Sequence, residues 1–465
     1  GGYSMAANTT GYSNTAVGRD TLKLNTTGVK NTAVGLNALD ANVSGGHNVA
    51  VGYLALSANT GSYNTAVGGD ALESNTSGED NVAVGKNALE DNTTGSDNVA
   101  VGRNALDTNT TGNGHVAIGF DAGDAISTNN FTTAVGFNAL TENYAGLVTA
   151  VGAYALAANT SGEYNTAVGY SALELNTTGD NNTAIGHKAL EANTTGTENV
   201  AVGTNTLYKN TTGSYNDASG FEALQANTTG DKNTALGYRT LYTNTTADNN
   251  TAVGFGALYF NDTGYENTAV GGDAALHTTT GYKNTAFGYR ALRDTTTGDE
   301  NVALGRYALL NNETGNKNTA VGNSALNFSE DVDENTAVGY RALYEVSTGT
   351  GNTGLGVDAG FKVTSGSNNL LLGHDAGQTA SPSGKITSGS NIVCLGNNSV
   401  TDLYCADTSI SSSDSRDKTD VTNFTHGLNW INQLNPVTYR WDKRAWYDDN
   451  TPDGSKKRNK KHIGF

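Results

Sequence analysis

The chain has 465 residues, of which 36% are apolar and 15% charged, and 59 are glycine. So few apolar side chains disfavour a compact globular core for a chain of this length. The formal net charge of −18 repels nucleic acids and anionic membranes, and no apolar run approaches the ~18 residues that cross a bilayer, so we expect neither a nucleic-acid partner nor membrane insertion.

The dominant feature is a repeat. The triplet Ala-Val-Gly, or a close variant, returns about every 17 residues from Ala16 through Ala33 and Ala50 to Ala337, Gly354 and Leu371. The consensus is Asn-Thr-Ala-Val-Gly-x-x-Ala-Leu-x-x-Asn-Thr-Thr-Gly-x-x. Such polarity is also typical of disordered chains, but the strict spacing of the apolar positions argues against disorder.

The period selects the type of repeat. Helical-pair repeats need roughly 33 to 47 residues, whereas one coil of short strands with glycine corners fits into 17. We therefore predict an all-β fold, a repetitive parallel β-solenoid or β-roll of about 23 rungs covering residues 1 to about 400. Here a rung is one 17-residue unit.

Positions within a rung have distinct expected roles. The β-branched Thr and Val suit a strand, with Val17, Val34 and their successors expected to stack inside while the neighbouring Ala leaves room for another wall or chain. Gly18 and its equivalents mark a corner that needs positive φ or close backbone approach. The following Ala-Leu pair completes a thin core, and its backbone is either a second strand or one helical turn.

Asn-Thr-Thr-Gly, as at residues 25–28, is expected to close each coil, because Asn side chains bond the nearby backbone and tolerate turn conformations. Stacked copies predict Asn and Thr ladders. The tripeptide Asn-Thr-Thr is also an N-glycosylation sequon, so sugar attachment is the alternative function. The variable x positions carry charged and Tyr side chains and are expected to form a solvated outer face.

No cofactor or metal is expected, because the seven histidines lack ligand spacing and no calcium-binding nonapeptide is present. The two cysteines, Cys394 and Cys405, are either buried free thiols or one disulfide.

The regularity changes towards the C-terminus. After Leu371 the next match is Cys394, and all three tryptophans lie beyond residue 425. We predict a shaft at residues 1–380, an irregular last rung and connector at 381–412, and a different module at 413–465. The chain starts in mid-repeat, so we expect it to be a piece of a longer protein.

The last module opens with Ser-Asp-Ser-Arg-Asp-Lys at 413–418, followed by His-Gly-Leu-Asn-Trp-Ile at 426–431 and Leu-Asn-Pro-Val-Thr-Tyr-Arg-Trp at 434–441. This order of motifs resembles the start of the endosialidase-type intramolecular chaperone domain of phage tail fibres and tail spikes. The resemblance implies a small α+β module, here truncated after Phe465, that assembles three chains and then cuts itself off.

The same resemblance implies Ser413 as nucleophile and Lys418 as base, with the cut between Ser412 and Ser413. A serine hydroxyl needs a neighbouring base, and a lysine acts as one when burial lowers its pKa, so the chemistry is coherent. The repeats are similar to those of trimeric autotransporter adhesin heads, which implies a three-chain β-roll.

These features favour a trimeric, tail-fibre-like structural protein that attaches to a cell-surface glycan or protein receptor, located in a virion or outside the cell. No enzymatic activity on external substrates is expected. A bacterial cell-surface adhesin or extracellular filament subunit is the alternative, and an ice- or polysaccharide-binding solenoid is the third hypothesis.

Overall fold

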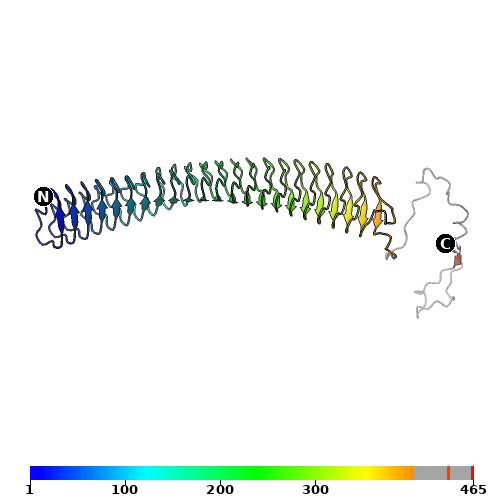
Figure 1. The fold of residues 1–465 in the computed structure, drawn as a ribbon, viewed down its shortest axis with the longest axis horizontal. Helices are drawn as coiled ribbons and strands as arrows, with labels where there is room; N and C mark the ends of the chain where they lie inside the picture. Colours follow the sequence, from blue (N-terminus) through cyan, green and yellow to red (C-terminus); the bar gives the residue numbers. More distant parts are fainter. Residues whose placement is uncertain (403–436, 440–461, 465) are drawn as a thin grey trace, which may run out of the picture. The chain divides into compact units, whose positions relative to one another are not determined.

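The computed structural model describes residues 1–402, 437–439 and 462–464. The chain divides into two units, residues 1–401 and residues 402–465. The first unit is a rod of stacked rungs that curves gently along its length (Figure 1). The described residues contain no helix, and accordingly none long and apolar enough to cross a membrane.

Each rung of the first unit contributes one three-residue strand to a single sheet of 23 strands. The strands are β1 (Thr15–Val17), β2 (Thr32–Val34), β3 (Val49–Val51), β4 (Thr65–Val67), β5 (Val82–Val84), β6 (Val99–Val101), β7 (Val116–Ile118), β8 (Thr133–Val135), β9 (Thr149–Val151), β10 (Thr166–Val168), β11 (Thr183–Ile185), β12 (Val200–Val202), β13 (Asp217–Ser219), β14 (Thr234–Leu236), β15 (Thr251–Val253), β16 (Thr268–Val270), β17 (Thr285–Phe287), β18 (Val302–Leu304), β19 (Thr319–Val321), β20 (Thr336–Val338), β21 (Thr353–Leu355), β22 (Leu370–Leu372) and β23 (Val393–Leu395).

Successive strands pair in parallel and in register. β1 aligns Ala16 with Ala33 of β2, and the same pairing continues where the spacing changes. Val49 of β3 pairs with Thr65 of β4, 16 residues later, and Leu370 of β22 pairs with Val393 of β23, 23 residues later. Changes in rung length are therefore absorbed by the turns. The predicted parallel β-solenoid is confirmed.

The core differs from the prediction in one respect. In β2 to β20 the middle Ala is buried, as at Ala33 and Ala50, while the residue that follows it points outward: Val67 and Val84 are each 37% exposed. The prediction that the valines stack inside was wrong. Side chains alternate between the two faces of a strand, so a three-residue strand whose middle residue faces inward has its outer two residues on the other face.

The Ala-Leu segment is neither a second strand nor a helical turn. Leu39 has φ of 55° and Asn37 φ of 57°, and the Leu39 amide donates to Ala55 O of the next rung at 3.0 Å. A left-handed conformation costs an L-residue about 1–2 kcal/mol. Burying a leucine side chain contributes about 1.5–3 kcal/mol, which offsets that cost. Leu39 is fully buried, so core packing holds the strained turn.

The glycine after each strand has the expected role at the corner. Gly35 has φ of +142°, and a Cβ added there would lie 2.1 Å from the carbonyl oxygen of Gly52 in the next rung. Both the conformation and the close approach of neighbouring rungs exclude a larger side chain.

The predicted Asn and Thr ladders are present, and the asparagines are buried. Asn25 Nδ2 donates to Asn8 Oδ1 at 2.9 Å, and Asn42 Nδ2 donates to Asn25 Oδ1 at 2.9 Å. Thr26 Oγ1 donates to the Val43 carbonyl of the next rung at 3.1 Å. Because burying an amide without a hydrogen bond is costly, these ladders stabilise the polar interior between rungs. They satisfy most but not all of the buried amide atoms, since Asn42 Oδ1 has no hydrogen-bond partner.

In the second unit, β24 (Val437–Tyr439) pairs antiparallel with β25 (His462–Gly464). The predicted module at 413–465 otherwise lies outside the described residues, so its boundaries and its α+β content stay predictions. Cys394 is a buried free thiol, as one of the two alternatives expected, whereas Cys405 lies outside the described residues.

Candidate functional site

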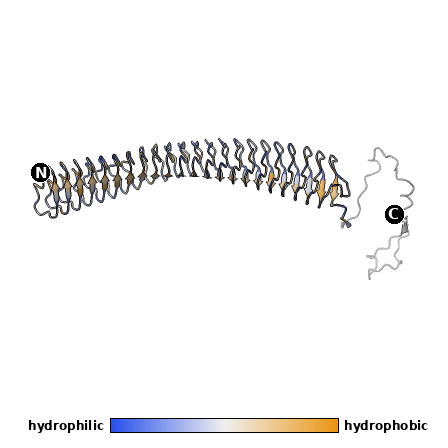
Figure 2. Ribbon diagram, in the orientation of Figure 1, coloured by the Kyte–Doolittle hydropathy of each residue, from blue (hydrophilic) through white to orange (hydrophobic). Residues whose placement is uncertain are grey.

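The strand face of the rod presents an exposed apolar column. Figure 2 shows the hydrophobic colour on the row of strands, most strongly towards the C-terminal end of that row. The third residues of many strands are exposed although they are apolar, as at Val17, Val67, Val84, Ile118, Val168, Ile185, Val202, Leu236, Phe287, Leu304, Leu355 and Leu395. β13 interrupts the column with Ser219 at this position. Extended apolar surfaces mark contact sites with other molecules.

A second surface carries aromatic rings. We call the residues that directly follow the corner glycines the ring column, because rings at this position stack on those of the next rung. Phe221 stacks on Tyr238 with centroids 5.4 Å apart, and Tyr238 stacks on Phe255 at 5.0 Å with the planes 5° from parallel. Further along, Gly272 occupies the same position, so this stack ends at Phe255.

Beside the end of that stack lies a hollow of about 290 Å³. We call it the Gly256 notch. Its lining combines aromatic, apolar and charged side chains: Tyr238, Arg239, Phe255, Gly256, Tyr259, Phe260, Asp273 and Leu276. Small-molecule sites are mostly apolar with a few oriented polar groups, and this lining has that character.

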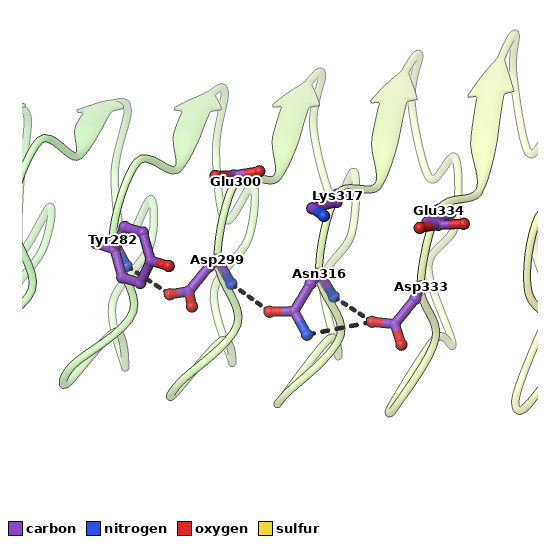
Figure 3. A pocket seen from close by; sticks show the side chains of 7 residues that line it. All are labelled: Tyr282, Asp299, Glu300, Asn316, Lys317, Asp333 and Glu334. Atoms are coloured by element: carbon purple, nitrogen blue, oxygen red, sulfur yellow. Dashed lines mark hydrogen bonds between the residues drawn. The ribbon is translucent and has the colours of Figure 1, made fainter.

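A polar hollow of about 380 Å³ lies nearer the C-terminal end of the rod. Figure 3 shows its side chains in two rows along the rungs. In one row each backbone amide donates to the side chain of the next rung: Tyr282 N to Asp299 Oδ1 at 2.9 Å, Asp299 N to Asn316 Oδ1 at 2.8 Å and Asn316 N to Asp333 Oδ1 at 2.7 Å. These oxygens are occupied in holding the rungs together.

The other row of the polar hollow alternates in charge, with Glu300, Lys317 and Glu334 on successive rungs. Among the described residues, no group of three or more His, Cys, Asp or Glu side chains is placed to hold a metal ion. The hollow therefore has the chemistry of a solvated surface whose side chains support the stacking of rungs.

Carboxylates form a further column near the N-terminal third of the rod. Burial, reinforced by the neighbouring carboxylates of Glu90 and Asp124, raises the pKa of Asp107 to about 6. Burial also raises the pKa of Glu90, with Glu73 adding to the effect. Like charges one rung apart each disfavour ionisation of their neighbours.

One rung replaces a ladder asparagine with His115. Its ring reproduces the asparagine contacts, since Nε2 lies 2.8 Å from Asn129 O and Nδ1 accepts from the Thr132 amide at 3.3 Å. Burial lowers the pKa of His115 to about 4, although the bond to Asn129 opposes the shift. The neutral tautomer with hydrogen on Nε2 satisfies both contacts.

The comparison with protein families concerns the C-terminal unit. Residues 413–465 match the family model described as chaperone of endosialidase. This match and the β-solenoid of the first unit together fit a tail-fibre-like protein with an intramolecular chaperone domain. No curated protein and no solved structure matches the chain.

The chaperone region contains both residues that the sequence assigns to self-cleavage. Ser413 and Lys418, and the Ser412–Ser413 bond, lie outside the described residues. Their proximity and the processing step remain predictions that follow from the family resemblance.

The expectation of a solvated outer face at the variable positions does not include the ring column or the Gly256 notch. A signal was nevertheless available. When the rungs are aligned on their corner glycines, Phe221, Tyr238 and Phe255 fall in one column. Because successive rungs are in register, side chains of one column must be neighbours.

Proposed function

We propose that the chain is a fibre protein of the tail-fibre type, in which three copies assemble into a shaft that holds a receptor-binding surface at a distance from a virion or cell. The observation that carries this proposal is the combination of a rod of 23 stacked strands with a chaperone-of-endosialidase match at residues 413–465. A solenoid is suited to spanning a distance, because each repeat contacts only its neighbours and every added rung lengthens the rod.

The strand face is the surface that we assign to trimer contacts. Its outward column, including Val67 and Val84, is exposed in the single chain, and association would remove this apolar area from water. The in-register strands make the face regular along the rod, so three copies can pack without change of register. Small inward alanines keep each chain thin.

Sedimentation analysis tests the assembly. We expect a mass of three times the 48.0 kDa chain. Val67→Lys together with Val84→Lys should shift the population towards monomer, because charges would be buried in the contact. The matched control Asp97→Lys changes an exposed residue outside the strands and should leave the mass unchanged. A monomeric parent chain, or an unchanged mass for the valine variants, contradicts the assigned interface.

We further propose self-cleavage by Ser413 and Lys418. The Ser413 Oγ attacks the carbonyl carbon of Ser412 while Lys418 takes the hydroxyl proton. The C–N bond then breaks, the amine of Ser413 receives the proton, and water hydrolyses the resulting ester, which releases the shaft with Ser412 at its end. A lysine serves as base only if its pKa is lowered by its surroundings.

Mass spectrometry of the purified protein tests the cleavage. We expect a fragment that ends at Ser412 in the parent, and an intact chain for Ser413→Ala. Ser415→Ala is the matched control, since it removes a neighbouring hydroxyl and should leave processing at the parental rate. Normal processing of Ser413→Ala would refute the nucleophile assignment.

A further inference from the structure

We propose that the Gly256 notch binds a neutral pyranose unit of a surface glycan. This inference rests on the proposed attachment function and names the ligand class and its site. The notch lies where one side chain is missing from the shaft. In the second position after the corner glycines, Gly256 is the only glycine along the shaft, and its φ is +61°.

The residues on either side of Gly256 in this column are charged and paired. Arg239 Nε lies 2.7 Å from Glu222 Oε2, and Arg290 Nε lies 3.2 Å from Asp273 Oδ2. Gly256 separates the two ion pairs, so a cation and an anion face each other across a gap of one side chain. A Cβ added to Gly256 would lie 3.3 Å from Asp273 Oδ1, so this oxygen borders the gap.

Aromatic rings form the walls of the notch. Phe255 is 62% exposed and ends the stack that begins at Phe221. On the other side, Tyr259 and Phe260 meet at 4.5 Å with their planes 65° apart, and Leu276 completes the apolar lining. The exposed rings offer flat apolar surface that needs little side-chain ordering on binding.

The charged groups at the rim are held in place. Arg239 lies over the Tyr238 ring at 5.1 Å and the Tyr242 ring at 5.4 Å, and its ion pair to Glu222 uses Nε. Its terminal nitrogens are oriented donors, since a guanidinium has five N–H groups. Asp273 bonds Arg290 through Oδ2, which leaves Oδ1 as an acceptor towards the notch.

The exposed rings and the balanced charges of the notch together favour a neutral sugar as ligand. Two acidic and two basic side chains give a neutral site, so neither an anion nor a cation gains net attraction there. A pyranose presents an apolar C–H face to a ring and hydroxyls that both donate and accept, which matches Phe255 with Arg239 and Asp273. The volume of about 290 Å³ is at the small end for ligand sites, which suits one or two sugar units.

Titration of the whole purified chain with methyl glycosides of neutral hexoses and N-acetylhexosamines tests the site, with saturation-transfer NMR and calorimetry as readouts. We expect saturable binding of at least one neutral sugar. Phe255→Ala should weaken it about tenfold, which is the loss expected from one aromatic contact. Gly256→Asn should abolish it by filling the notch. Asparagine occupies this position with positive φ in another rung, at Asn205, so the variant should fold.

Two controls separate the notch from general surface effects. Phe137→Ala removes an exposed ring of the ring column far from the notch. Asn205→Gly creates a glycine at the same rung position, where Tyr208 matches Tyr259 but Thr204 and Lys209 replace the Phe255 and Phe260 walls. Both should bind sugar as the parent does. Absence of neutral-sugar binding, binding of sialylated or protein ligands alone, or parental affinity in Gly256→Asn would overturn the proposal.

Sedimentation of the same samples keeps the two proposals apart. A trimer that binds no neutral sugar refutes the notch and leaves the fibre assembly standing. A monomer that binds sugar, with loss in Gly256→Asn, refutes the assembly and leaves the notch standing.

Discussion

Asn193 Nδ2 donates to Asn176 Oδ1, one rung earlier, at 2.8 Å. The same nitrogen also donates to Gly196 O of its own turn at 3.0 Å, and Asn193 Oδ1 accepts from Asn210 of the next rung at 2.9 Å. One buried side chain thus links three rungs and closes its own turn. Such a ladder stabilises the rod where the single-chain apolar core is thin.

Asn193→Ala should destabilise the stack locally. The substitution leaves Asn176 Oδ1 and Asn210 Nδ2 buried with a lost partner, which costs about 1–3 kcal/mol. Because stability in a solenoid is a sum of neighbour terms, faster hydrogen exchange should be confined to nearby rungs. Thr195→Ala, at an exposed position two residues on, should exchange as the parent does. Equal protection in both variants would show that the ladder is not a source of stability.

Gly186→Ala tests whether the rod requires glycine at the corner after each strand. Gly186 has φ of +140°, and an added Cβ would lie 2.4 Å from Gly203 O. The backbone conformation alone costs about 1–3 kcal/mol, and the contact adds to it. We expect a lower thermal midpoint. Gly69→Ala is the control, because nothing lies within 4 Å of its added Cβ. An equal decrease of the thermal midpoint in Gly69→Ala would contradict a steric contact between rungs as the cause.

Asp107→Asn tests the carboxylate column. Burial raises the pKa of Asp107 from its ordinary 3.8 to about 6, so between these values the native state binds a proton that the unfolded chain does not. Stability from this group therefore increases as the pH falls from about 6 towards 4. The variant should raise the midpoint at pH 7 and reduce this increase. Thr111→Ala, an exposed uncharged neighbour, should leave the pH slope unchanged, and a parental slope in Asp107→Asn would refute the prediction.

The sequence predicted the period, the parallel stacking, the glycine corners and the ladders because each follows from residue type repeated at fixed spacing. It did not predict which face of the strand is inside. Ala33 and Val34 are adjacent apolar residues, and a three-residue strand is too short for alternation to separate them. Tertiary packing determines which face is buried. The buried Leu39 fills the interior, so the strand residue that faces it must be as small as alanine.

Local sequence preferences also do not predict the left-handed turn at Leu39. Leucine rarely adopts positive φ, so neither strand nor helix was correct for the Ala-Leu segment.

The sequence does not predict the candidate site for a different reason. The ring column exists only between rungs, so Phe255 and Gly256 acquire meaning when neighbouring copies are compared position by position, and not within one repeat.

His115→Asn tests the one histidine in the buried ladder. Burial lowers the pKa of His115 from its ordinary 6.5 to about 4, so between these values the unfolded chain binds a proton that the native ring does not. Stability from this group is therefore lost as the pH falls from about 6.5 towards 4, the opposite sign to Asp107. A proton on Nδ1 would also face the Thr132 amide that now donates to it.

An asparagine at position 115, as in most other rungs, should keep both contacts, because its amide supplies a donor and an acceptor where the ring supplies Nε2 and Nδ1. Hydrogen exchange of the strands around β7 at pH 4.5 and pH 7 measures the effect. We expect the parent to lose protection there at pH 4.5 and His115→Asn to retain it. His187→Asn, which changes a ring stacked on the outer surface against Tyr170, is the control and should behave as the parent does around β7. Equal acid sensitivity of β7 in His115→Asn and the parent would mean that the buried imidazole does not set the acid limit of this rung.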